Sequence, residues 1–539
     1  MNHGKSNHES DSDQLNGSSG QHAGWSAFIA EHVEEGAARN PDWLGNAQVY
    51  EWSDEYGNVA PRHPGLEEEL FGDMKPEGEY RGVLDIEVRV EGPERLQPIR
   101  KFEDAGLHPV LLENIALCRY GSPMPIQSYI IPAVLTGHDV VGISQTGSGK
   151  TAAYLVPAIS KLAGKVELMA CSRRKGRAEP LIVIMVPTRE LALQIFNDAR
   201  RLCYRTMMRP CVAYGGRDDT ANSIKEISKG CDILIGTPGK LKDLMEKPDV
   251  LTMSRVKYTV IDEADELLSP DWDSEFSMLM VGGDTNEDAD HVFMMFSATF
   301  PKEARSLARQ YMAEDHYRIR VGRPGQSHMN IRQDIIEVDH FRKNEAVYDL
   351  LESVERTRTL IFCNSKATVD LLDDYLYNRG LPVTSIHGER NQREREDAYT
   401  AFRTGRCPIL IATGLSSRGW DVSNIGHVIN RDLPDTQYGG ITEYVHRIGR
   451  TGRMGHTGLA TSFFGDRDEG LAQDLVNCLV ECNCPVPEFL SHLTPQEGQI
   501  DFGDNSDDEA DEDHPSGDDN GNADGDVDEA ADELARSRL

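Results

Sequence analysis

Short apolar runs recur through residues 100–480 and constrain the fold of this 539-residue chain more than any other feature. Runs that are apolar throughout and alternate with helices are typical of parallel strands covered on both faces. Helical patterns such as KATVDLLDDYLYNRG separate many of the runs. The first series is DVVGI, PLIVIMVP, CDILIGTP, YTVID and HVFMMFSAT at 139–143, 180–187, 231–238, 258–262 and 291–299. The second series is TLIFCNS, PVTSIHG, PILIAT and HVIN at 359–365, 382–388, 408–413 and 427–430.

The segment GRPGQSHMN at residues 322–330 divides these strands into two series. Gly and Pro within it are typical of a linker. We therefore predict two α/β domains in tandem, each with a parallel sheet, at residues 96–321 and 322–490, and we expect a ligand between them. Residues 1–95 form an N-terminal extension and residues 491–539 a tail.

Negative charge is concentrated in the two ends of the chain. The formal net charge is −34, but residues 1–100 carry 20 acidic and 8 basic side chains, and residues 501–539 carry 16 acidic and 2 basic. We expect the extension and the tail to be acidic and mostly disordered, because they hold few large apolar groups. The body between them is only mildly acidic, so a basic groove for nucleic acid on one face is compatible with the composition.

Aromatic residues in the extension leave two interpretations open. Trp25, Phe28, Trp43, Tyr50 and Trp52 stand in an acidic context. They could form a segment that folds on contact with a partner protein, or they could pack as local clusters against the body. The acidic tail is a second candidate for protein contacts.

The segment SQTGSGKT follows the strand DVVGI and precedes an apolar helical pattern. Gly147 and Gly149 allow backbone N–H groups to curl round phosphates at a helix N-terminus, where Lys150 would reach the β- and γ-phosphates and Thr151 would bind Mg²⁺. A glycine-rich turn without function is the alternative, but the flanking strand and helix favour a phosphate loop. The predicted nucleotide-binding residues here are Ser144, Gln145, Thr146, Gly147, Ser148, Gly149, Lys150 and Thr151.

The strand YTVI ends in a group of acidic residues, Asp262, Glu263 and Asp265. Taken alone, this could be the start of a solvated acidic helix. A phosphate loop needs an acidic element on another strand to hold Mg²⁺, directly or through water, and this is the role predicted for Asp262. Glu263 would then orient or deprotonate the attacking water.

Several short motifs now point to one family. VIDEAD, SQTGSGKT, PTRELA, TPGK, SAT and HRIGRTGR occur in the order found in the DEAD-box RNA helicases, which residues 100–480 resemble. SATFP and the inserted VGGDTNEDADHVFMMF are similar to the Vasa/Ded branch. The resemblance implies two RecA-like domains, ATP and Mg²⁺ as cofactors, and RNA as the partner.

The resemblance also assigns residues at the nucleotide. Gln127 would read the adenine edge, as a side-chain amide can, with Phe102 stacking on the base or packing beside it. Arg450 and Arg453 would act as arginine fingers, with His446 nearby. Ser297, Ala298 and Thr299 would couple nucleotide binding to domain closure. Gly419 and Asp421 would contact the ribose.

The RNA contacts that the resemblance implies are mostly small, hydroxyl or backbone-exposing groups with a few arginines. Such groups suit phosphate and sugar contacts that do not read sequence. In the first domain they are Pro187, Thr188, Arg189, Gly215, Gly216, Thr237 and Pro238. In the second they are His387, Gly388, Gln392, Arg395 and Thr413.

The expected function is an ATP-dependent RNA helicase that closes on ATP·Mg and single-stranded RNA, bends the strand and unwinds short duplexes locally. An ATP-gated RNA clamp in ribonucleoprotein particles needs the same residues and stays open as the alternative. A DNA translocase is the third interpretation, which TPGK and the RNA-type motifs disfavour.

The expected cellular context follows from features that the sequence lacks and from the resemblance to the Vasa/Ded branch, which favours the cytoplasm. No apolar run of about 18 residues occurs, so we expect no membrane partner. The ten cysteines have no disulfide-framework spacing, and the first residues have no apolar core of a secretory signal. We expect a monomer in the cytoplasm, with the nucleus as the alternative.

Overall fold

The computed structural model describes residues 19–32, 59–72, 74, 88–144, 147–163, 177–215, 219–267, 291–298, 302–322, 331–414, 425–452, 457–482 and 484–495. Predicted site residues outside these ranges are Gln145, Thr146, Gly216, Thr299, Gly419, Asp421 and Arg453, and the side chain of Gln392 is also outside the description. Nearly all of the predicted tail lies outside it as well. Among the described residues, no helix combines the length and the apolar character that a membrane span requires.

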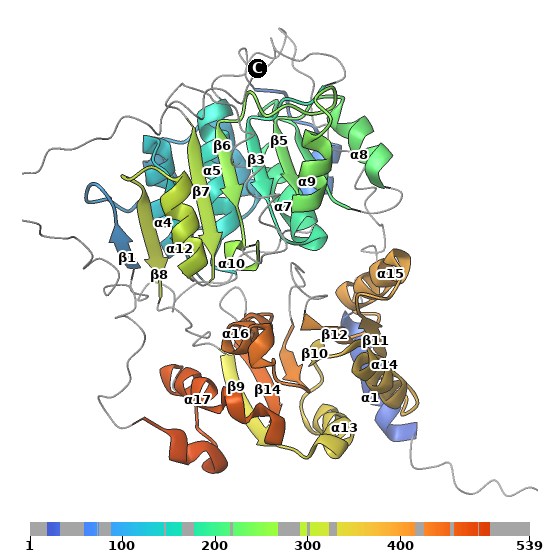
Figure 1. The fold of residues 1–539 in the computed structure, drawn as a ribbon. Helices are drawn as coiled ribbons and strands as arrows, with labels where there is room; N and C mark the ends of the chain where they lie inside the picture. The colour runs from blue at the N-terminus through green and yellow to red at the C-terminus, as the bar shows by residue number, and fades with distance from the viewer. Residues whose placement is uncertain are drawn as a thin grey trace, which may run out of the picture. The chain divides into compact units, whose positions relative to one another are not determined.

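The first lobe is built on an eight-stranded sheet with the order β1-β8-β2-β7-β6-β3-β5-β4 (Figure 1). All neighbours are parallel except β1, which pairs antiparallel with β8 at one edge. The five predicted strands are present, while β1, β4 and β8 were not predicted. The strands are β1 Val88–Glu91, β2 Val140–Ile143, β3 Ile182–Met185, β4 Pro210–Ala213, β5 Ile233–Gly236, β6 Tyr258–Ile261, β7 Val292–Ser297 and β8 Tyr317–Val321.

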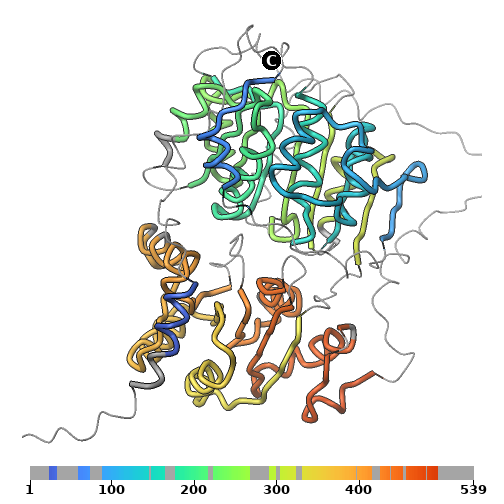
Figure 2. The backbone as a smooth tube through the Cα atoms, turned by 180° about the vertical axis from the view of Figure 1, so that it is seen from behind, coloured from blue at the N-terminus to red at the C-terminus, as the bar shows by residue number. Residues whose placement is uncertain are grey.

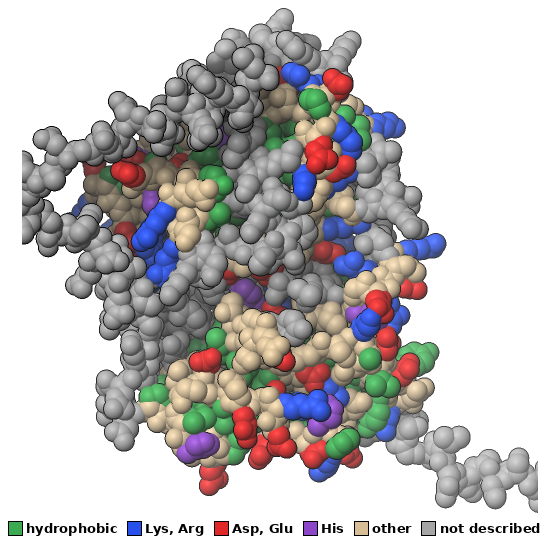
Figure 3. All heavy atoms as spheres, in the orientation of Figure 1, with side chains coloured by type: hydrophobic (Ala, Val, Ile, Leu, Met, Phe, Trp, Pro, Cys, Tyr) green, Lys and Arg blue, Asp and Glu red, His purple; other side chains and the backbone are tan. Residues whose placement is uncertain are grey.

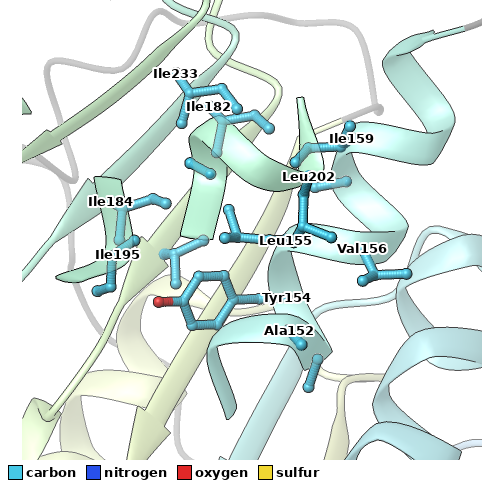
Figure 4. Packing of buried hydrophobic residues seen from close by; sticks show 14 of the residues in the cluster. Ala152, Tyr154, Leu155, Val156, Ile159, Ile182, Ile184, Ile195, Leu202 and Ile233 are labelled. Atoms are coloured by element: carbon cyan, nitrogen blue, oxygen red, sulfur yellow. The ribbon is translucent and has the colours of Figure 1, made fainter. Parts of the chain in front are cut away.

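Alternate residues of strands β2 to β7 enter opposite core clusters, so both faces of this part of the sheet are covered. Ile182 and Ile184 of β3 pack with one cluster, and Val183 and Met185 with the other. Figure 4 shows part of the first cluster, between β3, β5 and two helices. The helices of the lobe are α3 Pro109–Leu117, α4 Pro125–Thr136, α5 Lys150–Ala163, α7 Arg189–Leu202, α8 Asp219–Ile227, α9 Pro238–Met245, α10 Ala264–Leu267 and α12 Lys302–Tyr311.

The second lobe has a six-stranded, entirely parallel sheet with the order β11-β12-β10-β13-β14-β9. Its strands are β9 Ile331–Glu337, β10 Thr359–Cys363, β11 Val383–Ile386, β12 Ile409–Thr413, β13 His427–Asn430 and β14 Gly458–Phe464. Its helices are α13 Lys343–Ser353, α14 Lys366–Tyr377, α15 Gln392–Arg403, α16 Gly440–Ile448 and α17 Ala472–Glu481. The predicted fold class, two tandem α/β domains with parallel sheets, is confirmed.

Three segments of the N-terminal extension are structured, which the prediction of a mostly disordered extension did not include (Figure 2). Helix α1, Ser19–His32, buries Trp25 in the second lobe, with Phe28 beside it. Helix α2, Pro64–Phe71, packs on the first lobe, where the Tyr204 hydroxyl donates to Glu67 Oε1 at 2.8 Å. Strand β1 extends the first sheet. Trp25 and Phe28 thus pack against the body, whereas Trp43, Tyr50 and Trp52 lie outside the described residues.

Candidate functional site

Three predicted ATP motifs lie at the carboxyl ends of neighbouring strands in the first lobe. The phosphate loop follows β2, the Ser297 motif ends β7, and the acidic motif follows β6. Strand β7 pairs with both β2 and β6, in parallel. Because the carboxyl ends of parallel strands share one edge, residues far apart in the chain meet here, as ligand sites of open α/β sheets do.

The described part of the phosphate loop is held by its own polar groups. The Lys150 ammonium donates to the carbonyl oxygen of Ser144 at 2.9 Å, and the hydroxyls of Ser144 and Ser148 are 2.6 Å apart. Gly147 and Gly149 have φ values of 79° and 86°, the left-handed region that favours glycine. Lys150 begins α5, so the helix N-terminus faces this loop, as phosphate binding requires.

Gln127 joins the predicted adenine-reading segment to the phosphate loop. Its Oε1 accepts a hydrogen bond from the Met124 N–H at 3.0 Å, and its Nε2 donates to Gly149 O at 3.1 Å. A Cβ at Gly149 would lie only 2.4 Å from that Nε2. Phe102 is buried in the first core cluster, where its ring packs against protein. Contacts of Gln127 and Phe102 with adenine stay predictions.

Asp262 is buried, and its two carboxylate oxygens have different partners. Oδ1 accepts from the Glu263 N–H at 3.0 Å, and Oδ2 accepts from the Tyr154 hydroxyl at 3.0 Å. Thr151 also influences the pKa of the Tyr154 hydroxyl, so Thr151 and Asp262 share one neighbour. Carboxylate and hydroxyl oxygens are the donors that Mg²⁺ accepts, and these two residues therefore fit the predicted metal site. The sequence analysis did not single out Tyr154.

Burial and nearby positive charges shift the pKa values of the carboxyl groups in the acidic motif in opposite directions. Burial raises the pKa of Asp262, which the Lys150 charge lowers again. Burial also raises the pKa of Glu263, and the positive charge of Arg450 is the largest influence that lowers it. Glu263 has a φ of 52°, an uncommon conformation for a residue with a side chain, and such strain clusters at functional sites. A raised carboxyl pKa suits a group that accepts a proton from water.

Ser297 connects the phosphate loop with the acidic motif. Its carbonyl oxygen accepts from the Ser144 N–H at 3.1 Å, and its hydroxyl accepts from the Asp265 N–H at 3.2 Å. His446 of α16 approaches the same acidic motif, with Nε2 at 3.9 Å from Asp265 Oδ2 and Nδ1 at 3.8 Å from Glu266 Oε1. Burial lowers the pKa of His446. The geometry thus brings together Ser297 and His446, which the sequence analysis named.

The predicted RNA residues of the first lobe occupy the other half of the same sheet edge. They follow β3, β4 and β5, which are neighbours in the order β3-β5-β4. The Arg189 guanidinium lies 4.1 Å from the centre of the Tyr214 ring, and Thr188 Oγ1 accepts from the Leu191 N–H at 3.3 Å, capping α7. Pro187 precedes that cap, Thr237 and Pro238 begin α9, and Gly215 follows Tyr214.

The predicted RNA residues of the second lobe also follow strand ends. His387 and Gly388 come after β11, and His387 Nε2 is 3.1 Å from Asp370 Oδ1. Thr413 ends β12. Arg395 of α15 donates to Glu190 Oε1 of the first lobe at 3.4 Å. In Figure 3, acidic and basic side chains are interspersed over the described surface of the second lobe.

Arg447 belongs to the HRIGR motif but is bound inside the second lobe. Its Nε donates to Glu443 Oε1 at 2.9 Å, its Nη1 to Asp432 O at 2.9 Å and its Nη2 to Asn364 Oδ1 at 3.2 Å. A Cβ at Gly414 would lie 2.3 Å from Glu443 Oε1. The sequence analysis gave Arg447 no role. The structure separates Arg447, which holds α16 to the sheet, from Arg450, whose charge reaches Glu263.

Two sequence families match consecutive parts of the chain. The DEAD/DEAH box helicase family matches residues 124–307, and the helicase conserved C-terminal domain matches residues 342–455. Together the two matches span more than half of the chain.

Solved structures of Saccharomyces cerevisiae Dbp5 have a similar fold. A variant bound to a Gle1 variant and IP6 is 25% identical with a TM-score of 0.56, covering 70% of this chain and 92% of that one. Dbp5 bound to RNA and ADP BeF3 is 24% identical with a TM-score of 0.59, covering 74% and 100%.

Proposed function

The chain belongs to the DEAD-box family of RNA helicases, RNA-dependent enzymes that hydrolyse ATP, and from this premise we propose how it works. Its two lobes close on ATP and a single RNA strand, bend that strand and so unwind short duplexes locally. One observation carries the proposal. A single sheet edge of the first lobe holds the ATP motifs after β2, β7 and β6, and the RNA candidates after β3, β5 and β4. Binding of either ligand at this edge therefore affects the surroundings of the other.

At the nucleotide, Lys150 binds the phosphates, and Glu263 orients a water molecule and accepts its proton. The water oxygen bonds to the γ-phosphorus as the bond to the ADP oxygen breaks. Arg450 stabilises the negative charge on the phosphoryl oxygens, and the lowering of the Glu263 pKa by its positive charge supports this role. Mg²⁺, when bound by Asp262 and Thr151, neutralises phosphate charge.

At the RNA, backbone and hydroxyl groups at the strand ends bind phosphates and sugars without reading bases. Thr188, Gly215 and Thr237 serve this purpose in the first lobe, and Gly388 and Thr413 in the second. Among the described residues, no atom lies within 4 Å of a Cβ built at Gly215 or Gly388, which supports backbone contacts with a ligand there. Within the ATP half of this edge, Ser297 joins the phosphate loop to the acidic motif through its bonds to Ser144 and Asp265.

The substitution Glu263→Gln tests this proposal. It should abolish steady-state ATP hydrolysis and multiple-turnover strand displacement of a short RNA duplex, while ATP-dependent RNA binding is retained or strengthened. Glu345→Gln, the same change on exposed α13, is the control and should behave as the unaltered protein. Unchanged hydrolysis by the Glu263 variant would refute the role given to this carboxylate.

An ATP-gated RNA clamp is the alternative use of the same residues. Strand displacement and RNA residence time separate the two uses: a clamp holds RNA for long periods in ATP while it displaces few strands. A helicase releases RNA with each turnover. Measuring both rates on one duplex with a single-stranded extension decides which describes this chain.

Three narrower proposals rest on the sequence. Similarity of SATFP and VGGDTNEDADHVFMMF supports membership of the Vasa/Ded branch, which a phylogeny of helicase cores would test. We propose that the protein is a monomer, and a dimer mass in light scattering would contradict this. We also propose that it is located in the cytoplasm, and a solely nuclear signal of the tagged protein in cell imaging would contradict that.

We also propose that the acidic tail limits RNA binding or contacts protein partners. Deleting residues 501–539 should strengthen RNA binding at low salt, where charge repulsion is least screened. Equal affinities across a salt series would reject a role in RNA binding.

A further inference from the structure

Tyr154 presents a polar group in the middle of an apolar core. Its ring packs among the aliphatic residues of α5, α7 and β3 (Figure 4) and lies 5.0 Å from the Phe296 ring. Its side chain is fully buried. A phenylalanine would supply the same ring packing, so packing does not account for the hydroxyl. Burying a hydroxyl is unfavourable unless it is hydrogen-bonded, and this one is bonded on the side of the ATP site.

The two residues that fit the metal site both neighbour this tyrosine, and one of them accepts a hydrogen bond from its hydroxyl. Tyr154 is three residues after Thr151 on α5, so the two side chains lie on one helix face. The same hydroxyl donates to Asp262 Oδ2 at 3.0 Å, although Asp262 is 108 residues away in the chain. With Oδ1 held by the Glu263 N–H, the Asp262 carboxylate is fixed at both oxygens.

We propose that Tyr154 is a positioning residue that orients Asp262, which would hold the magnesium ion of the bound nucleotide together with Thr151. The inference rests on the proposed function, since it assumes that these two residues hold Mg²⁺. A residue that does not bind the metal itself can fix the orientation of a metal ligand by a hydrogen bond to it. Removing such a residue typically weakens metal binding about 10–100-fold. The hydroxyl acts in this way through the fixed carboxylate, and it never touches the ion or the nucleotide.

The test is Tyr154→Phe in the full chain, with Tyr444→Phe as the matched control. Tyr444 is equally buried, and its hydroxyl donates to Gln333 Oε1 at 2.9 Å within the second lobe, away from the phosphate loop. Binding of a fluorescent ADP analogue is measured during Mg²⁺ titration from an EDTA baseline. We expect the Mg²⁺ concentration at half-saturation to rise roughly tenfold for Tyr154→Phe and to stay unchanged for Tyr444→Phe. Affinity for the metal-free nucleotide should be the same in all three proteins.

Measurements of stability and of the double variant separate a specific effect on Mg²⁺ binding from a general loss of stability. Both variants lose one buried hydrogen bond, so their melting temperatures should fall by similar amounts, and only the Mg²⁺ dependence should differ. In an Asp262→Asn background, Tyr154→Phe should have little further effect on Mg²⁺ dependence, because the oriented carboxylate is gone.

Equal Mg²⁺ dependence of the two tyrosine variants would overturn the inference and leave the proposed function intact. An unaltered protein whose nucleotide binding ignores Mg²⁺ would overturn the proposed metal site and this inference together. A full tenfold effect of Tyr154→Phe in the Asp262→Asn background would also overturn it, since Tyr154 would then act by another route.

Discussion

The amide nitrogen of Gln127 donates a hydrogen bond to the carbonyl oxygen of Gly149 at 3.1 Å, joining the start of α4 to the phosphate loop. With Oε1 accepting from the Met124 N–H, the amide is oriented unambiguously. The shape of the phosphate loop therefore depends on a side chain 22 residues earlier in the chain.

Gly149→Ala should abolish this arrangement. The new Cβ would lie 2.4 Å from Gln127 Nε2, and the φ of 86° is unfavourable for alanine. We expect at least a tenfold loss of nucleotide affinity in a fluorescence titration. Gly137→Ala is the control, because its φ of 92° imposes similar strain where a Cβ meets nothing within 4 Å. Comparable nucleotide affinities for the two variants would show that the contact with Gln127 is unimportant.

Arg447→Ala should destabilise the second lobe. The change leaves the buried Glu443 carboxylate without its 2.9 Å partner and removes the bonds to Asp432 O and Asn364 Oδ1. Breaking a buried ion pair from one side costs about 3–5 kcal/mol. Urea unfolding followed by circular dichroism measures this loss. Arg467→Ala, at an exposed arginine, should change the unfolding free energy little, and a similar loss there would contradict the argument.

Trp25→Ala should release α1 from the second lobe. Trp25 is 3% exposed and packs with residues of β10 and α14, and Arg356 lies 5.7 Å from its ring. Removing a packed tryptophan side chain costs about 3 kcal/mol or more. The loss of stability here cannot exceed the free energy with which α1 docks on the second lobe, because α1 detaches beyond that point. Hydrogen exchange should quicken in α1, Ser19–His32. Phe341→Ala, at a residue 93% exposed, should leave exchange unchanged, and slow exchange in the Trp25 variant would refute the docking role.

Acid should destabilise the second lobe through His427. Burial lowers the pKa of this histidine from 6.5 to about 4, and its Nε2 lies 2.9 Å from Thr461 Oγ1. Between these pH values the unfolded chain binds the proton more readily, so this contribution to stability is complete above pH 6.5 and is lost as the pH falls toward 4.

From pH 7 to pH 5 the loss amounts to roughly 2 kcal/mol, given about 1.4 kcal/mol per pKa unit. His427→Gln cannot titrate there, so its unfolding free energy in urea should fall less over the same interval. A parallel pH dependence of the two proteins would exclude this histidine as the cause.

The sequence by itself determined the fold class, most of the strands and the residue types at the ATP site. These follow from local chemistry: apolar runs form buried strands, glycines permit the loop before Lys150, and acidic residues after β6 stand at a strand end. Strands β1, β4, β8, β9 and β14 escaped detection. Strand β8, YRIRV, places arginines between its buried residues and lacks the continuous apolar run that marks the others.

Only the tertiary structure decided which distant residues meet. The strand order puts β7 between β2 and β6, which allows Ser297 to bond both ATP motifs. It also pairs Tyr154 with Asp262 across 108 residues and Arg447 with Asn364 across 83. Periodicity and motif spacing report on neighbours within one element. Such pairs depend on the packing of separate elements in three dimensions, which no local pattern encodes.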